Sequence, residues 1–239
     1  MRLGMGLRMG SQTLAGFSPA SLFAPADDGW YWQPSLATTF TDTARTTSTT
    51  LGNAIGGVTD SSGKANHGLQ ATADARMVLR QAANDSYYYE SDTTNDALQT
   101  GMNLASKRVT FAMAFKPLAR TFVLLMNGPS SSPYAMLGDS GAGSTALTTA
   151  GVTLNSAYFD NVLFAGTTRG ALYTAAQSAK SVIFDITTNS TAWETPSIGK
   201  LSPFGIYTPG DVFSVLAIDR EITETERGDL SDSFMALVP

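Results

Sequence analysis

The single histidine of the chain, His67, is the first residue that could do chemistry, because it lies in a loop crowded with polar side chains. The loop, residues 58–68, reads VTDSSGKANHG. A common zinc site would need a second histidine or cysteines, and the chain has neither. A Ser-His-Asp triad would need a Gly-x-Ser-x-Gly turn, which is also missing. Asp, Ser and Asn in such a run bond back to the backbone of a tight loop. We therefore predict a structural loop built from Asp60, Gly63, Asn66 and His67.

Carboxylates near the C-terminal end of the chain are the second group that could do chemistry, because a glycosidase uses two carboxylates as acid and nucleophile. In a β-sandwich such an enzyme would carry its carboxylates at alternate positions of one inner strand, and no Glu-x-Asp-x-x-Glu run is present. The nearest approach is Asp219, Glu221 and Glu224, where a strand ends and a helix begins. Capping and the helix dipole explain negative charge there. We predict that the protein is not an enzyme, with a polysaccharide-degrading enzyme as the less favoured alternative.

Cofactor and metal sites have no sequence signature either. The glycine-rich residues 4–16 and 138–143 lack the Lys-Ser/Thr that follows a phosphate-binding loop. Aspartates occur in several loops, but no EF-hand or other fixed calcium spacing is present. We predict no cofactor and no metal.

Aromatic side chains could bind sugars by stacking on their rings. Tyr87, Tyr89 and Tyr134 are the candidates for this role, which gives the alternative of a carbohydrate-binding module. Trp30 and Trp32 would share one face of a strand, and two such large side chains are expected in the core.

The elements that would position these residues are mostly strands. Residues 109–115 alternate apolar and small side chains, and residues 212–218 are apolar on both faces, as in an inner strand. Turns rich in Gly, Pro, Asn and Asp separate many short strand candidates, which predicts an all-β antiparallel sandwich. Further strands are expected over residues 30–32, 77–79, 87–90, 122–126, 134–137, 152–154, 158–164, 182–186 and 192–194. Thr223 and Glu226 have the spacing of a capping box, which predicts a short C-terminal amphipathic helix.

The first ten residues form a separate pattern. Methionine and leucine occupy the odd positions, while arginine and glycine occupy the even ones. Such alternation is typical of an extended strand with one apolar face. We predict an N-terminal docking arm over residues 1–19 that binds a partner through Leu3, Met5, Leu7 and Met9, with the sandwich over residues 20–239. The alternative is an extended start that packs on its own domain or stays disordered.

Composition limits the partners. Of the 239 residues 43% are hydrophobic, enough for a core, but only 15% are charged, against about 25% in an average protein. The net charge of −5 gives no electrostatic support to a nucleic-acid partner. No apolar run approaches the roughly 20 residues that span a bilayer. We therefore expect neither nucleic-acid binding nor membrane insertion.

Both ends of the region 20–238 carry a resemblance to a known family. The first end reads SLFA at 21–24, GWY at 29–31, PS at 34–35, FTD at 40–42, VTDSSGKANH at 58–67 and QAT at 70–72; the last reads AIDREITE at 217–224. This pattern resembles phage proteins with a concanavalin A-like (laminin-G-type) jelly-roll domain. The chain departs from it at Gln33, where an Asp is usual, and at Ala65, which replaces the second Gly of the loop. The middle of the chain is unspecific.

The resemblance implies a component of the exterior of a phage particle: a fibre, tail-tip or head-decoration protein that displays a lectin-like sandwich. Its partners would be other virion proteins, bound through the N-terminal arm, and host surface glycans in the carbohydrate-binding alternative. A homo-oligomer is expected, and analogy suggests a trimer.

Overall fold

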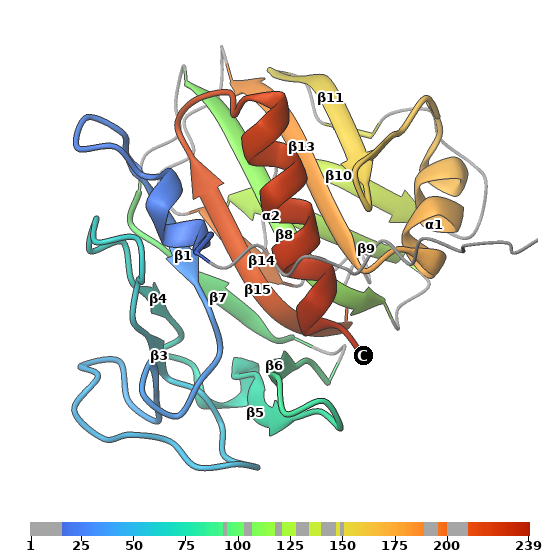
Figure 1. Cartoon of the computed structure of the whole chain (residues 1–239). Helices are drawn as coiled ribbons and strands as arrows, with labels where there is room; N and C mark the ends of the chain where they lie inside the picture. Colours follow the sequence, from blue (N-terminus) through green and yellow to red (C-terminus); the bar gives the residue numbers. More distant parts are fainter. Residues whose placement is uncertain are drawn as a thin grey trace, which may run out of the picture.

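A computed structural model of the chain describes residues 16–92, 95–102, 107–117, 121–127, 134–139, 147–148, 151–188, 196–199 and 210–239. These residues form a mostly β protein with two antiparallel sheets (Figure 1). One large hydrophobic cluster takes residues from both sheets, so the sheets share a core. The prediction of an antiparallel, mostly β fold is confirmed.

The first sheet has the strand order β12-β11-β13-β8-β15-β6-β5, and β1 also pairs with β15. Its strands are β1 (Gly29–Trp32), β5 (Val78–Gln81), β6 (Tyr87–Glu90), β8 (Arg108–Pro117), β11 (Val152–Phe159), β12 (Val162–Leu163), β13 (Ser181–Thr188) and β15 (Gly210–Ile218).

The second sheet has the order β10-β9-β14-β7-β4-β3-β2. Its strands are β2 (Thr39–Phe40), β3 (Gly57–Val58), β4 (Gly68–Leu69), β7 (Ala97–Gln99), β9 (Thr121–Asn127), β10 (Tyr134–Asp139) and β14 (Pro196–Gly199). The helical segments are η1 (Pro19–Leu22), η2 (Ala73–Ala75), α1 (Arg169–Ser178) and α2 (Glu224–Leu237).

Strand β8 shows how the alternating sequence builds both faces of the first sheet. Its large apolar side chains lie in the shared core: Val109, Phe111, Met113 and Phe115. Ala112 and Ala114 point to the opposite face, where they belong to the cluster beneath α2. Alternate residues of a strand face opposite sides of a sheet, and alanines leave room for a helix to pack closely. The alternation predicted from the sequence is confirmed.

Strand β15 lies inside the first sheet, as expected for a strand that is apolar on both faces. It pairs with β8 on one side and with β1 and β6 on the other. Its register shifts between Val212 and Ser214, which indicates a β-bulge. Because of this shift Val212 and Val215, although three residues apart, both face the shared core, while Phe213 faces the helix side.

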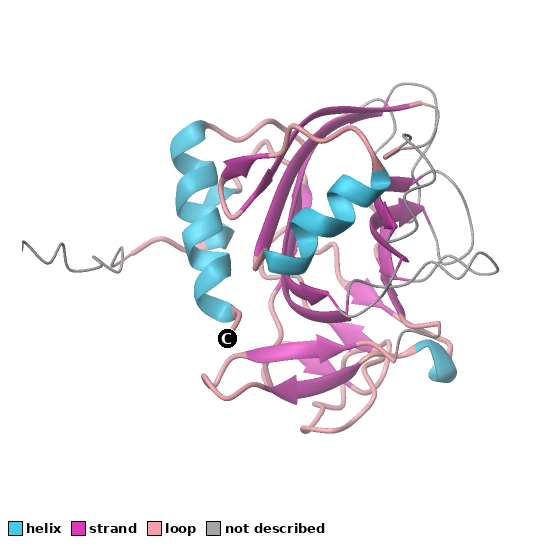
Figure 2. Ribbon diagram, turned by 90° about the vertical axis from the view of Figure 1, so that its right-hand side faces the viewer, coloured by secondary structure: helices cyan, strands magenta, loops and turns pink. Residues whose placement is uncertain are grey.

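Helix α2 begins with the predicted capping box. The Thr223 hydroxyl accepts a hydrogen bond from the Glu226 N–H at 3.3 Å, and the Glu226 carboxylate accepts one from the Thr223 N–H at 2.7 Å. The helix buries Leu230 and Phe234 against the outer face of the first sheet. Figure 2 shows α2 lying along one side of the strands.

Helix α1 was not predicted. Its N-cap, Thr168, accepts a hydrogen bond from the Ala171 N–H at 3.1 Å, and Leu172 and Ala176 are buried in the shared core. The predicted strand over residues 158–164 is wrong in its length, because the chain turns at Asp160 and Asn161 and returns as β12. The predicted strand over residues 192–194 lies outside the described residues.

Within the described ranges, no helix is both long enough and apolar enough to span a membrane.

Residues 17–19, which we assigned to the arm, begin the folded part, since Phe17 packs against the cluster beneath α2 and Pro19 is buried.

Candidate functional site

Asp60 holds the loop 58–68 together from a position where its side chain is buried. Its Oδ1 accepts hydrogen bonds from the backbone N–H groups of Tyr31, at 2.8 Å, and Ser62, at 2.9 Å. Its Oδ2 accepts from the Ser62 hydroxyl at 2.7 Å and from the Asn66 N–H at 3.0 Å. All acceptor positions of this carboxylate thus serve the loop and strand β1.

His67 is positioned by the same loop. Its Nδ1 accepts a hydrogen bond from the Asp60 backbone N–H at 3.1 Å. Partial burial, and then the positive charge of Arg45, lower the pKa of His67, while Asp60 raises it. The imidazole is therefore neutral at neutral pH, and its Nδ1 lone pair braces the loop instead of accepting a substrate proton.

Asn66 connects the loop to the start of the fold. Its side-chain amide donates to Asp28 Oδ1 at 2.9 Å and to the Gly29 carbonyl at 2.7 Å. The backbone carbonyl of Asn66 accepts a hydrogen bond from the Trp32 indole N–H at 3.0 Å. The loop is a structural junction between β1 and the strands that follow it. Gly63 lies at its turn with a φ of +83°, in the left-handed region that favours glycine.

Ala65, one of the two residues that depart from the quoted pattern, has a φ of +63°. The left-handed region costs an L-residue about 1–2 kcal/mol, while a glycine loses about 0.5–1 kcal/mol more conformational freedom on folding. We expect Ala65→Gly to raise the free energy of unfolding by about 0.5 kcal/mol in urea titrations. A loss of stability in this variant would contradict the strain argument.

The closing segment of the chain meets the opening one beside this loop. The Asp219 carboxylate accepts from the Asp28 N–H at 2.7 Å, and the Asp219 N–H donates to the Asp28 carbonyl at 3.0 Å. Lys107 Nζ lies 3.4 Å from the Asp28 carboxylate and 3.6 Å from that of Asp219. Residues from both ends of the quoted sequence pattern are therefore neighbours in one polar network.

Arg220 extends this network to α2. Its guanidinium donates to both oxygens of Glu226, at 3.0 and 2.7 Å, to Asp27 Oδ2 at 3.1 Å and to the Leu22 carbonyl at 2.8 Å. The hydrogen bonds from Arg220 are the main reason that the pKa of Glu226 falls to about 2. The strand end, η1 and the first turn of α2 are thereby fixed together.

This arrangement predicts how stability depends on pH. The pKa of Glu226 is lower in the folded chain than its ordinary 4.5, so its contribution is present above pH 4.5 and is lost as pH falls toward 2. The difference in unfolding free energy between the wild type and Glu226→Gln should be about 1–2 kcal/mol at pH 7, since the pair is part-exposed. Denaturant titrations at pH 7, 4.5 and 2.5 should show this difference shrinking with acidity. A constant difference would refute the assignment.

Asp96 also makes stability depend on pH, with the opposite sign to Glu226, and comparing the wild type with Glu226→Gln removes this effect. Burial raises the pKa of Asp96 from 3.8 to about 6, so ionisation of Asp96 makes folding less favourable as pH rises through this range. Because Asp96 is present in both proteins, its contribution cancels in the difference.

Asp185 and Glu221 are two carboxylates held close together by one arginine. Arg108 Nη2 lies between them, 2.7 Å from Asp185 Oδ2 and 2.8 Å from Glu221 Oε2. The niche that they line, with Tyr158 and Arg227, has a volume of only about 30 Å³. A sugar ring does not fit there, and Arg108 neutralises the charge that a nucleophile would need. We see these residues as an ion-pair group on the outer face of the first sheet.

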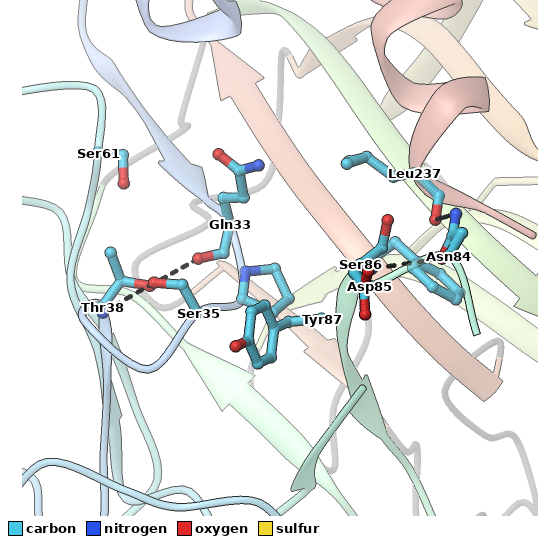
Figure 3. Close-up of a pocket in the computed structure, with 11 residues that line it drawn as sticks. Gln33, Ser35, Thr38, Ser61, Asn84, Asp85, Ser86, Tyr87 and Leu237 are labelled. Atoms are coloured by element: carbon cyan, nitrogen blue, oxygen red, sulfur yellow. Dashed lines mark hydrogen bonds between the residues drawn. The ribbon is translucent and has the colours of Figure 1, made fainter. Parts of the chain in front are cut away.

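A larger pocket, of about 410 Å³, lies on the same side of the molecule as the end of α2. One wall is the segment after β1, including Gln33, and the opposite wall is the turn between β5 and β6, residues 84–86 (Figure 3). Tyr87 lies at the pocket with its ring part-buried, and Phe213 and Leu237 add apolar surface. The pocket thus combines an aromatic ring with hydroxyl and amide groups, an arrangement that suits a polyol.

The walls are held in place by hydrogen bonds. Asn84 Nδ2 donates to the Leu237 carbonyl at 3.1 Å, which ties the turn to the end of α2. On the other wall the Tyr31 hydroxyl donates to Gln33 Oε1 at 2.9 Å, and burial raises the pKa of Tyr31 to about 12, so that it remains a donor. The Gln33 amide nitrogen is thereby directed across the pocket toward the side of Leu237 (Figure 3).

No protein-family model matches this chain, and no curated protein matches it.

The three candidate tyrosines have different positions. Tyr87 lines the pocket, and Tyr134 belongs to β10 but its side chain lies outside the described part. Tyr89 is fully buried, so the interpretation of Tyr89 as an exposed sugar-stacking residue is wrong. Tyr87 and Tyr89 share the core-facing side of β6, but only Tyr87 is near the rim. Leu3, Met5, Leu7 and Met9 lie outside the described residues.

Sequence reasoning missed most of the pocket. Gln33 drew attention only as a departure from the family pattern, and Ser61 only as part of the loop 58–68. The turn 84–86 gave no functional signal. Within the described ranges, no group of three or more His, Asp and Glu residues is arranged to hold a metal ion.

Proposed function

We propose that this chain is a non-enzymatic component of the exterior of a phage particle, with its two sheets forming a concanavalin A-like jelly roll. One observation carries the proposal: the residues behind the family resemblance lie together. Asp60 and Asn66 from the first part of the pattern and Asp219 from the last part join in one hydrogen-bonded network through Asp28, which precedes the quoted GWY. Arg220, the residue after Asp219, pairs with Asp27 beside this network. These residues of the pattern thus have structural roles in this chain, which supports a display role over catalysis.

In this proposal the arm holds the chain on a neighbouring virion protein, and the folded part faces outward as a homo-oligomer. Replacing Leu3, Met5, Leu7 and Met9 with serine should remove the protein from purified particles, measured by mass spectrometry. The matched control replaces Arg2 and Arg8, on the other face of the alternating segment, with serine and should leave incorporation intact. Normal incorporation of the four-serine variant would refute docking through the arm.

A second function, saccharide binding by the displayed domain, is favoured by the pocket beside Tyr87. The pocket combines an aromatic ring with hydroxyl and amide groups. Ring stacking and a few placed hydrogen bonds are the usual means of holding a polar ring in a protein pocket. This function is compatible with a virion location, because a displayed pocket could engage glycans of the host surface.

A further inference from the structure

The pocket beside Tyr87 has a distinctive charge. Asp85 is the one ionisable acidic side chain on its wall, and no lysine, arginine or histidine lines it among the described residues. Asp85 has a φ of +65° at the tip of the turn between β5 and β6, where a hydrogen bond from the Ala82 N–H to the Ser86 carbonyl closes the turn at 2.8 Å. The carboxylate is therefore held at the pocket by a defined turn.

The end of α2 adds to this negative field. Leu237, the last residue of the helix, lines the pocket, and its carbonyl is the acceptor of Asn84. The C-terminal end of a helix carries a partial negative charge because its last carbonyls have no partners inside the helix. Lys180 Nζ donates to the carbonyl of Val238, the next residue, at 2.8 Å, so part of the charge of the helix end is already paired. Asp85 is therefore the main group that disfavours an anion in the pocket.

The hydrogen-bonding groups agree with this polarity. The Tyr31 hydroxyl donates its hydrogen bond to the amide oxygen of Gln33, so the amide nitrogen of Gln33 is the group that can donate to a ligand. Ser61, Ser86 and Tyr87 bring three hydroxyl groups to the pocket wall. Hydroxyls donate and accept, so they match the hydroxyls of a sugar.

We propose that the pocket selects neutral or amine-bearing saccharides and rejects acidic ones such as uronic or sialic acids. This inference rests on the proposed saccharide binding and adds the class of sugar. A neutral ring would stack on Tyr87 and exchange hydrogen bonds with the hydroxyls of the pocket wall. An ammonium group would pair with Asp85, whereas a carboxylate would meet Asp85 with no cation on the pocket wall to compensate.

The test is a glycan array that contains neutral, amine-bearing and acidic oligosaccharides, probed with the full chain. The wild type should bind neutral and amine-bearing glycans and bind acidic ones at least tenfold more weakly. Asp85→Lys should reverse the preference between amine-bearing and acidic glycans. Asp74→Lys, which makes the same charge change at an exposed residue outside the pocket, should leave binding within twofold.

Tyr87→Ala separates this pocket from other surfaces and should weaken all binding at least tenfold. If Tyr87→Ala proves unstable, Asp85→Lys still tests the pocket, because Asp85 is exposed. Equal binding of acidic and neutral glycans, still sensitive to Tyr87, would overturn the charge selectivity but keep saccharide binding. Binding of no glycan on the array would overturn both.

Discussion

Replacing Asp60 with asparagine should lower the free energy of unfolding by about 3–4 kcal/mol. The carboxylate is buried and accepts four hydrogen bonds, from Tyr31, Ser62 and Asn66. Asparagine keeps the shape but turns one acceptor oxygen into a donor, which then faces the N–H and O–H groups that it should accept from. A hydrogen bond to a charged group contributes about 1.5–3 kcal/mol, so losing part of this set has a large effect.

Urea denaturation followed by tryptophan fluorescence would measure this loss, and the melting temperature should fall by roughly 10 °C. Asp74→Asn is the control, because it makes the same change at an exposed aspartate and should stay within about 0.5 kcal/mol. If Asp60→Asn were as stable as the control, Asp60 would not be the centre of the loop.

Arg220→Met should cost about 2–3 kcal/mol, the second largest effect that we expect. Methionine keeps most of the length of the side chain, but it leaves the carboxylates of Asp27 and Glu226 without their shared partner. The cost is moderated because the Arg220 side chain is 28% exposed. Removing one member of a part-buried ion pair is costly mainly because the other charge stays behind.

Arg80→Met provides a matched comparison for Arg220→Met. Arg80 pairs with Glu90 at 2.7 Å, but the two side chains are 43% and 39% exposed. Exposed pairs contribute at most about 1 kcal/mol, so this variant should be nearly as stable as the wild type. Similar losses for the two arginine variants, read from chemical denaturation, would contradict the view that Arg220 joins the two ends of the chain.

Local patterns predicted much of the fold. The alternation in residues 109–115 and the capping box at Thr223 depend on neighbours in sequence, and both are found in the structure. Helix α1 was missed because an Ala-rich segment with two buried residues, Leu172 and Ala176, gives little periodic signal. The β11–β12 hairpin was missed because Asp160-Asn161 is a weaker turn signal than Asn-Gly, although both residues have a positive φ.

The candidate site was less predictable, for a different reason. Gln33, Ser61, Tyr87 and Leu237 are far apart in sequence and meet only because β1, the loop 58–68, β6 and α2 pack together. Tyr87 and Tyr89 look alike in the sequence, since both occupy the same face of one strand. Which of the two lies at the rim depends on how β6 is placed against β15, and this long-range pairing has no local signature.

The central claim is that this chain is displayed on a phage particle with its pocket turned outward. A cryo-electron microscopy reconstruction of phage particles purified from the source of this sequence would test the claim most directly. We predict density for the chain on the particle exterior, with residues 1–16 against another virion protein and the pocket beside Tyr87 open to solvent. A particle that lacks the chain, or that buries this pocket against a neighbouring protein, would contradict the account.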